Sequence, residues 1–142
     1  MRPKPAEDRA RRWAHRLPAN YFGKKAASLL LGPAGGRAPR AFDVEVFDGA
    51  RARLHPFDNI CEKRVYLSPQ LWDAAERAAL ETEIKSADAG VFHFVDVGAN
   101  AGLYTLFVHA AAARANKSAR ALCVEPDVEM RRRLNFNLAA TG

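Results

Sequence analysis

The residues best placed to do chemistry lie in one short segment, D-V-G-A-N-A-G at residues 96–102. It follows residues 91–95, an apolar run with two Val and two Phe that we predict to be a fully buried strand. It precedes residues 103–110, which we predict to be a helix. A strand, a turn that contains glycine and a helix together present backbone N–H groups and a helix N-terminus to a nucleotide-like ligand.

A second acidic group, Glu125, follows residues 120–124, which we predict to be another short buried strand. Strand, helix and strand within this length imply a right-handed parallel crossover, and ligands of such sheets bind outside the carboxyl ends of the strands. Gly98 and Gly102 let a ligand approach without a Cβ in the way, and Asn100 tolerates an unusual φ. A carboxylate that ends the second strand can accept both hydroxyls of a ribose.

The spacing separates two classes of nucleotide ligand. A dinucleotide fingerprint reads G-x-G-x-x-G, whereas this turn reads G-A-N-A-G, and Asp96 would repel a pyrophosphate. S-adenosylmethionine carries a positive sulfonium and amino group and no phosphate, so a carboxylate near its amino-acid end is favourable. The pattern therefore disfavours a nicotinamide dehydrogenase. The alternative interpretations are a plain tight connection for the turn and a helix N-terminal carboxylate for Glu125.

Three segments resemble the FkbM family of S-adenosylmethionine-dependent methyltransferases: F-V-D-V-G-A-N-A-G-L-Y-T-L from residue 94, V-E-P-D from residue 124 and R-L-N-F-N-L from residue 133. The resemblance covers residues 91–142. It implies an enzyme with an α/β, Rossmann-like class I methyltransferase fold and a seven-stranded sheet. It further implies that Asp96, Gly98, Asn100 and Gly102 surround the methionine part of S-adenosylmethionine and that Glu125 binds the ribose. Many members methylate hydroxyls, so the implied partner is a small-molecule methyl acceptor such as a sugar or secondary metabolite.

The sequence ends where the third strand of such a sheet would begin. We therefore expect a fragment, with the methyltransferase fold truncated after its second βα unit and only a small sheet. No residue stands out as a catalytic base. In methyl transfer from a sulfonium, alignment of the nucleophile with the methyl group does much of the work, so a base need not be readable.

The remaining chemically versatile residues have simpler interpretations. We interpret His93 and His109 as packed or solvated, Tyr104 as a packing residue and Cys123 as part of the core. Cys61 and Cys123 have neither metal-ligand spacing nor a disulfide framework, so we expect no metal and a reducing, cytoplasmic setting.

The charge of the chain is unevenly distributed. Residues 1–40 hold ten Lys or Arg against Glu7 and Asp8, a charge of +8, whereas the other residues hold twelve against fourteen acids, a charge of −2. Because the predicted methyltransferase module is nearly neutral, nucleic acid is not expected as its obligate partner. Two interpretations of the basic N-terminal arm and linker over residues 1–40 stay open. It is either a solvated or partner-packed extension, or a non-catalytic binding module that touches an anionic surface, membrane or nucleic acid.

Local patterns predict the elements upstream of the motif. The arm should contain a helix that Pro18 ends, a second short helix over residues 21–31 and a Gly-rich break at residues 32–36. Alternating residues on either side of Asp48 and Gly49 predict a hairpin. Residues 64–67 are a candidate strand, and Ser68 and Pro69 predict the start of a helix that reaches about residue 86 and is closed by residues 88–90.

These patterns predict three regions: the arm over residues 1–40, the hairpin and helix over residues 41–90, and the first half of the methyltransferase domain over residues 91–142. The apolar share of 49% with 27% charged residues is typical of a globular protein. No apolar run approaches the roughly 20 residues that a membrane span needs.

Overall fold

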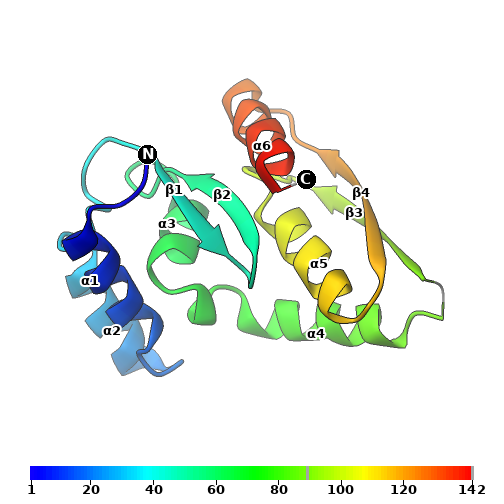
Figure 1. Cartoon of the computed structure of the whole chain (residues 1–142), viewed down its shortest axis with the longest axis horizontal. Helices are drawn as coiled ribbons and strands as arrows, with labels where there is room; N and C mark the ends of the chain where they lie inside the picture. The colour runs from blue at the N-terminus through cyan, green and yellow to red at the C-terminus, as the bar shows by residue number, and fades with distance from the viewer. Residues whose placement is uncertain (89, 142) are drawn as a thin grey trace. The chain divides into compact units, whose positions relative to one another are not determined.

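The computed structural model describes residues 1–88 and 90–141 and has a mixed α/β fold with small sheets (Figure 1). In chain order its elements are α1 (Pro5–His15), α2 (Tyr21–Leu30), β1 (Phe42–Val46), β2 (Ala50–Leu54), α3 (Ile60–Leu67), the 3₁₀ helix η1 (Pro69–Leu71), α4 (Ala74–Ser86), β3 (Val91–Val97), α5 (Leu103–Arg114), β4 (Ser118–Val124) and α6 (Val128–Thr141). Contacts group the chain into two compact units. The N-terminal unit comprises residues 1–46 and 52–74, and the C-terminal unit comprises residues 47–51 and 75 onward.

The N-terminal unit is built around Tyr66, which is fully buried. Its hydroxyl donates a 2.6 Å hydrogen bond to the carbonyl of Ala34, and its ring stacks on Phe42 with 4.9 Å between centroids. Burial raises the pKa of Tyr66 to about 12. The His15 ring lies 3.0 Å from the Tyr66 carbonyl, and burial lowers the pKa of that histidine. The two predicted helices of the arm are confirmed as α1 and α2, and they pack against α3 within this unit.

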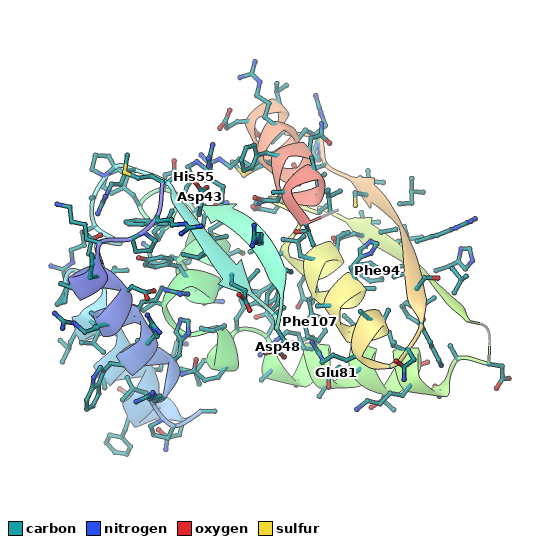
Figure 2. The ribbon with its side chains drawn as sticks, viewed as in Figure 1. Asp43, Asp48, His55, Glu81, Phe94 and Phe107 are labelled. Atoms are coloured by element: carbon teal, nitrogen blue, oxygen red, sulfur yellow. The ribbon has the colours of Figure 1, made fainter. Side chains whose placement is uncertain are left out.

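The predicted hairpin is confirmed as β1 and β2. Its turn runs through Phe47, Asp48 and Gly49, whose φ values of 49°, 59° and 119° are all positive. Asp43 lies on β1 (Figure 2). It accepts hydrogen bonds of 2.6 and 3.0 Å from the Arg53 guanidinium, and these bonds lower the pKa of Asp43 to about 2.

Two local predictions in the middle of the chain are wrong. Residues 64–67 are helical, not a strand, because the Asn59 side chain accepts from the Glu62 N–H at 3.0 Å and caps α3. The helix predicted from Ser68 is interrupted: η1 ends at Leu71, and Asp73 has a φ of 41° before α4 starts. The interruption allows Trp72 to be buried. The closure predicted at residues 88–90 includes Ala89, which lies outside the described residues.

In the C-terminal unit β3, α5 and β4 form the predicted parallel unit. The strands pair in register from Val91 opposite Ser118 to Val97 opposite Val124. The expected full burial of both strands is wrong, because side chains alternate between two different environments. The face with Phe94 and Asp96 packs against α5, whereas the opposite face is exposed at Val95, Val97, Leu122 and Val124. No element that the structure describes covers that second face. Cys123, predicted to be core, is half-buried on the α5 side.

Lysine 117 joins α4 to the start of β4. Its ammonium donates to the carbonyl oxygens of Ile84 at 2.8 Å and of Lys85 at 2.9 Å, and also to that of Ala87. These carbonyls lie at the C-terminal end of α4, where a helix has unsatisfied acceptors and a partial negative charge. One side chain thereby fixes where α4 stops relative to the sheet.

Among the described residues, no helix combines the length and the apolar character needed to cross a bilayer.

We predict that Lys117→Met lowers the free energy of unfolding by about 1–3 kcal/mol, because the variant keeps the apolar stem and leaves three helix-end carbonyls without their donor. Lys85→Met is the matched control, since Lys85 is largely exposed on the same helix end and should change stability by less than about 0.5 kcal/mol. Urea unfolding followed by circular dichroism measures both. Equal effects of the two substitutions would contradict the assigned role.

Candidate functional site

The turn between β3 and α5 is built from left-handed backbone. Gly98, Asn100 and Gly102 have φ values of 75°, 51° and 82°. Residues with a Cβ rarely adopt this region, and Asn is one of the few that tolerate it. The Asn100 side chain supports its own conformation, because its Oδ1 accepts from the Ala101 N–H at 2.8 Å. The residue types at these three positions are therefore explained by the path of the backbone.

All five backbone N–H groups of the turn are already used within the chain. Gly98 and Ala99 donate to the Val124 carbonyl at 2.7 and 3.1 Å, and Gly102 donates to the Ala99 carbonyl at 2.8 Å. Asn100 donates to the Glu125 carboxylate and Ala101 to the Asn100 side chain. The expectation that the turn presents free N–H groups to a ligand is thus wrong for residues 98–102. A turn without free donors is a poor receptor for phosphate, whose oxygens need them.

The Glu125 carboxylate ties the turn to the next helix. Its Oε2 accepts from the Asn100 N–H at 2.7 Å, and its Oε1 accepts from the Asp127 N–H at 2.9 Å. Asp127 in turn accepts from the Met130 N–H at 2.8 Å and caps α6. Of the predicted site residues, Gly98, Asn100, Gly102 and Glu125 are therefore brought together at the carboxyl ends of β3 and β4.

Asp96 lies apart from this group. It is only 7% exposed, and its Oδ2 accepts a 2.7 Å hydrogen bond from the Thr105 hydroxyl. The same hydroxyl lies 3.2 Å from the Cys123 sulfur, so the three side chains form a small polar cluster between the sheet and α5. In this position Asp96 holds the first turn of α5 against β3 and does not open toward a ligand.

Helix α6 packs on the back of the turn through residues that sequence reasoning did not assign to the site. The buried Asn137 side chain donates to the Ala101 carbonyl at 2.9 Å. A Cβ built on Gly102 would lie 2.6 Å from the Leu134 Cδ1, so the absence of a side chain at Gly102 allows the helix to approach. One signal in the sequence could have indicated this role. Asn137 is polar, yet it lies three positions after Leu134 and so falls on the buried side of the helix.

The side of the turn at Gly98, which we call its front, differs from the back, on which α6 packs. A Cβ built on Gly98 meets nothing within 4 Å, so this glycine borders open space. Each oxygen of a carboxylate can accept about two hydrogen bonds, and each Glu125 oxygen uses one for a backbone N–H. Glu125 therefore keeps one acceptor position on each oxygen. Two acceptors on one carboxylate match a pair of neighbouring hydroxyls.

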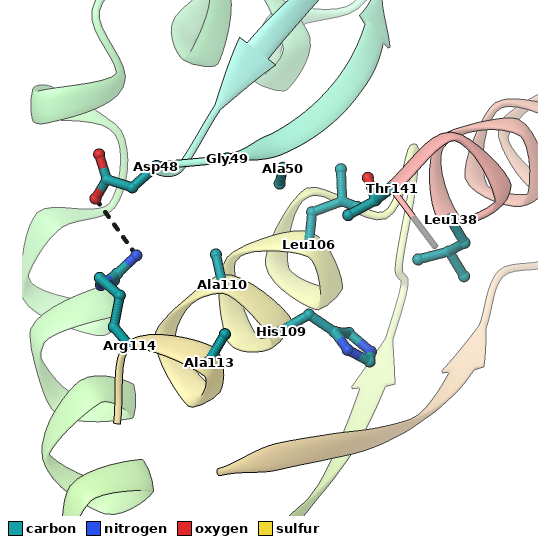
Figure 3. Close-up of a pocket in the computed structure, with 10 residues that line it drawn as sticks. All are labelled: Asp48, Gly49, Ala50, Leu106, His109, Ala110, Ala113, Arg114, Leu138 and Thr141. Atoms are coloured by element: carbon teal, nitrogen blue, oxygen red, sulfur yellow. Dashed lines mark ion pairs between the residues drawn. The ribbon is translucent and has the colours of Figure 1, made fainter. Parts of the chain in front are cut away.

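A cavity of about 640 Å³ lies elsewhere in the C-terminal unit (Figure 3). The turn at residues 48–50, helix α5 from Leu106 to Arg114 and the end of α6 line it, and Arg114 pairs with Asp48 across its rim at 3.4 Å. His109 lies along its wall. The cavity begins one turn into α5 and extends toward the C-terminus of that helix, away from the Gly turn. Among the described residues, no group of three or more His, Cys, Asp or Glu could hold a metal ion.

We predict that Gly98→Ala and Gly102→Ala differ in stability although both place a Cβ at positive φ. The backbone cost of about 1–2 kcal/mol is common to both. Gly102→Ala additionally displaces Leu134 and should cost about 1–3 kcal/mol more. Chemical denaturation of the two variants side by side provides the measurement. If Gly98→Ala proves the more destabilising, the assignment of front and back faces is wrong.

Comparison of the chain with protein-family models, with curated proteins and with solved structures gave no match in any of the three.

Proposed function

We propose that this chain is a methyltransferase, or the cofactor-binding part of one, that uses S-adenosylmethionine. We propose further that its C-terminal unit belongs to the Rossmann-like class I methyltransferase fold and that the acceptor is a hydroxyl of a small molecule such as a sugar or secondary metabolite. The free thiols Cys61 and Cys123 suit the reducing, cytoplasmic setting that we include in the proposal.

The observation that carries the proposal is the Glu125 carboxylate at the mouth of a turn whose own N–H groups are all used. Such a site offers acceptors and negative charge but no donors from residues 98–102. It therefore favours a ligand that brings hydroxyl and amino donors and a positive charge, and it disfavours one that brings phosphate. S-adenosylmethionine has that composition, and a dinucleotide does not.

The residues fit this cofactor in part. The open space beside Gly98 leaves room for a ligand against the backbone, and the two remaining acceptor positions of Glu125 suit the ribose hydroxyls. Asp96 faces Thr105, so we assign it the positioning of α5 and not a direct contact with the methionine part. When bound, the cofactor supplies a methyl group on a positively charged sulfur. The contribution of the chain is then to hold the ribose and to align the methyl group with the acceptor.

We predict that Glu125→Ala weakens binding of S-adenosylhomocysteine at least tenfold, because two charge-assisted hydrogen bonds are lost. Asp127→Ala is the matched control. It removes a carboxylate two residues away and costs about 1 kcal/mol as a lost helix cap, yet it keeps the backbone N–H that Glu125 uses. Isothermal titration calorimetry on both variants, with circular dichroism to confirm folding, measures the difference.

A second ligand separates direct contact with the ribose from collapse of the turn. If Glu125 binds the ribose, the native chain should prefer S-adenosylhomocysteine over its 2′-deoxy analogue, and Glu125→Ala should lose that preference. Absence of binding of S-adenosylmethionine and S-adenosylhomocysteine to the folded native chain would overturn the proposal. Displacement of the bound ligand by NAD would point to the dehydrogenase class instead.

A further inference from the structure

Helices α1 and α2 carry an unusual set of exposed side chains. Trp13, Tyr21, Phe22 and Leu29 are 67%, 64%, 77% and 76% exposed. The inner faces of the same helices use small residues, with Ala14, Gly23 and Ala27 buried. Amphipathic helices of a globular unit normally place their large apolar side chains inward. In this helical pair the arrangement is reversed, so packing of the unit does not explain the large residues.

The chain approaches itself closely at Gly23, near the start of α2. A Cβ built on Gly23 would lie 1.9 Å from the Pro18 carbonyl oxygen, and the Gly23 N–H donates a 2.9 Å hydrogen bond to the Asn20 side-chain oxygen. The connection between α1 and α2 is only five residues long, so Trp13 near the end of α1 and Phe22 near the start of α2 lie at the same end of the pair. The exposed apolar groups therefore lie on two helices that pack against each other.

Cations are interleaved with these apolar groups. Arg9, Arg12, Trp13 and Arg16 follow the spacing of one face of α1, and all four are exposed. On α2, Phe22, Lys25 and Leu29 share a face, and the Lys25 ammonium lies 5.1 Å from the centre of the Tyr21 ring. We define the helical-pair surface as the following exposed residues: Arg9, Arg12, Trp13, Arg16, Tyr21, Phe22, Lys24, Lys25 and Leu29.

Most cations of the helical-pair surface have no carboxylate partner among the described residues. Residues 9–40 contain eight Lys or Arg and no Asp or Glu. Of its cations, Arg12 pairs with Asp8. Arg9, Arg16, Lys24 and Lys25 form no ion pair with any residue that the structure describes. The surface thus combines large apolar side chains with unneutralised positive charge.

We propose that the helical-pair surface binds the interface of an anionic lipid bilayer. Trp and Tyr favour the headgroup region, Phe and Leu favour the acyl chains below it, and Lys and Arg attract anionic headgroups. Nucleic acid would use the cations and stack on the aromatic rings, but it offers nothing comparable to bury Leu29. The surface lies in the N-terminal unit and includes none of the proposed cofactor residues, so this inference does not depend on the proposed function.

Vesicle sedimentation tests the proposal with the whole chain. We expect binding to phosphatidylcholine vesicles that contain phosphatidylserine and at least tenfold weaker binding to phosphatidylcholine alone. Raising NaCl from about 0.05 to about 0.3 M should weaken the binding, because the Debye length shortens. Lys24→Glu with Lys25→Glu should reduce it at least tenfold, since each basic residue contributes about fivefold near an anionic surface.

Apolar insertion is tested separately from charge. Phe22→Ser with Leu29→Ser should reduce vesicle binding at least tenfold and leave the far-ultraviolet spectrum unchanged, because both side chains are exposed. Phe57→Ser is the matched control, since Phe57 is also exposed in the N-terminal unit but lies outside the helical-pair surface. The chain has two tryptophans, and Trp72 is buried. The emission shift on binding should therefore come from Trp13 and disappear in Trp13→Phe.

Three outcomes would overturn the proposal. Vesicle binding that is unchanged in the Phe22 and Leu29 double variant would exclude insertion. Tighter binding to RNA or duplex DNA than to anionic vesicles at the same salt would assign the surface to nucleic acid. A dimer in solution that becomes monomeric in the same double variant, without vesicle binding by the native chain, would assign the surface to a second copy of the chain.

Discussion

The Glu125 carboxylate is the constraint on which the C-terminal unit depends. It joins two segments of the chain, because one oxygen binds the N–H of Asn100, 25 residues earlier in the turn after β3, and the other binds the N–H of Asp127 at the start of α6. Asn100 has a left-handed φ of 51°, and its N–H donates to the carboxylate at 2.7 Å. Removing the charge would leave a turn N–H without its partner and would free the beginning of α6. The bond therefore couples the conformation of the turn to the position of the helix that packs on its back.

This coupling determines what the turn can recognise. A glycine-rich turn before a helix is commonly a donor site, with free N–H groups that hold phosphate. Here the N–H groups of residues 98–102 are used by the Val124 carbonyl, by Glu125 and by the turn itself. What remains at the front is a carboxylate with spare acceptor positions and the open side of Gly98. The polarity of the site is thus reversed relative to a phosphate-binding turn, although its strand, turn and helix are the same.

Local signals predicted most of the secondary structure, and long-range contacts account for what was missed. A few neighbouring residues determine the roles of Gly98, Asn100, Gly102 and Asp127. These residues could therefore be predicted as special backbone positions and as a helix cap. The role of Asp96 depends on its hydrogen bond with Thr105, nine residues away. The hydrogen bond between Ala101 and Asn137 spans 36 residues. No local pattern encodes either pair. The error at residues 64–67 has a long-range cause and a local one, because the burial of Tyr66 and the Asn59 cap outweigh the strand propensity of Val and Tyr. The burial of β3 was overestimated because an apolar residue on either face of a strand looks the same in sequence.

The two units carry their apolar residues in contrasting ways. In the C-terminal unit α5 is apolar nearly all round, with Leu106, Phe107 and Val108 buried, as expected of a helix enclosed by its neighbours. In α1 and α2 the buried positions are small and the large apolar side chains face outward beside cations. Near the start of α2, the Gly23 backbone and the Pro18 carbonyl are in close contact. The large apolar side chains of the outer faces are exposed, so they are not part of the buried core of the unit. The physical consequence is a face that gains free energy by entering a partly apolar, negatively charged environment.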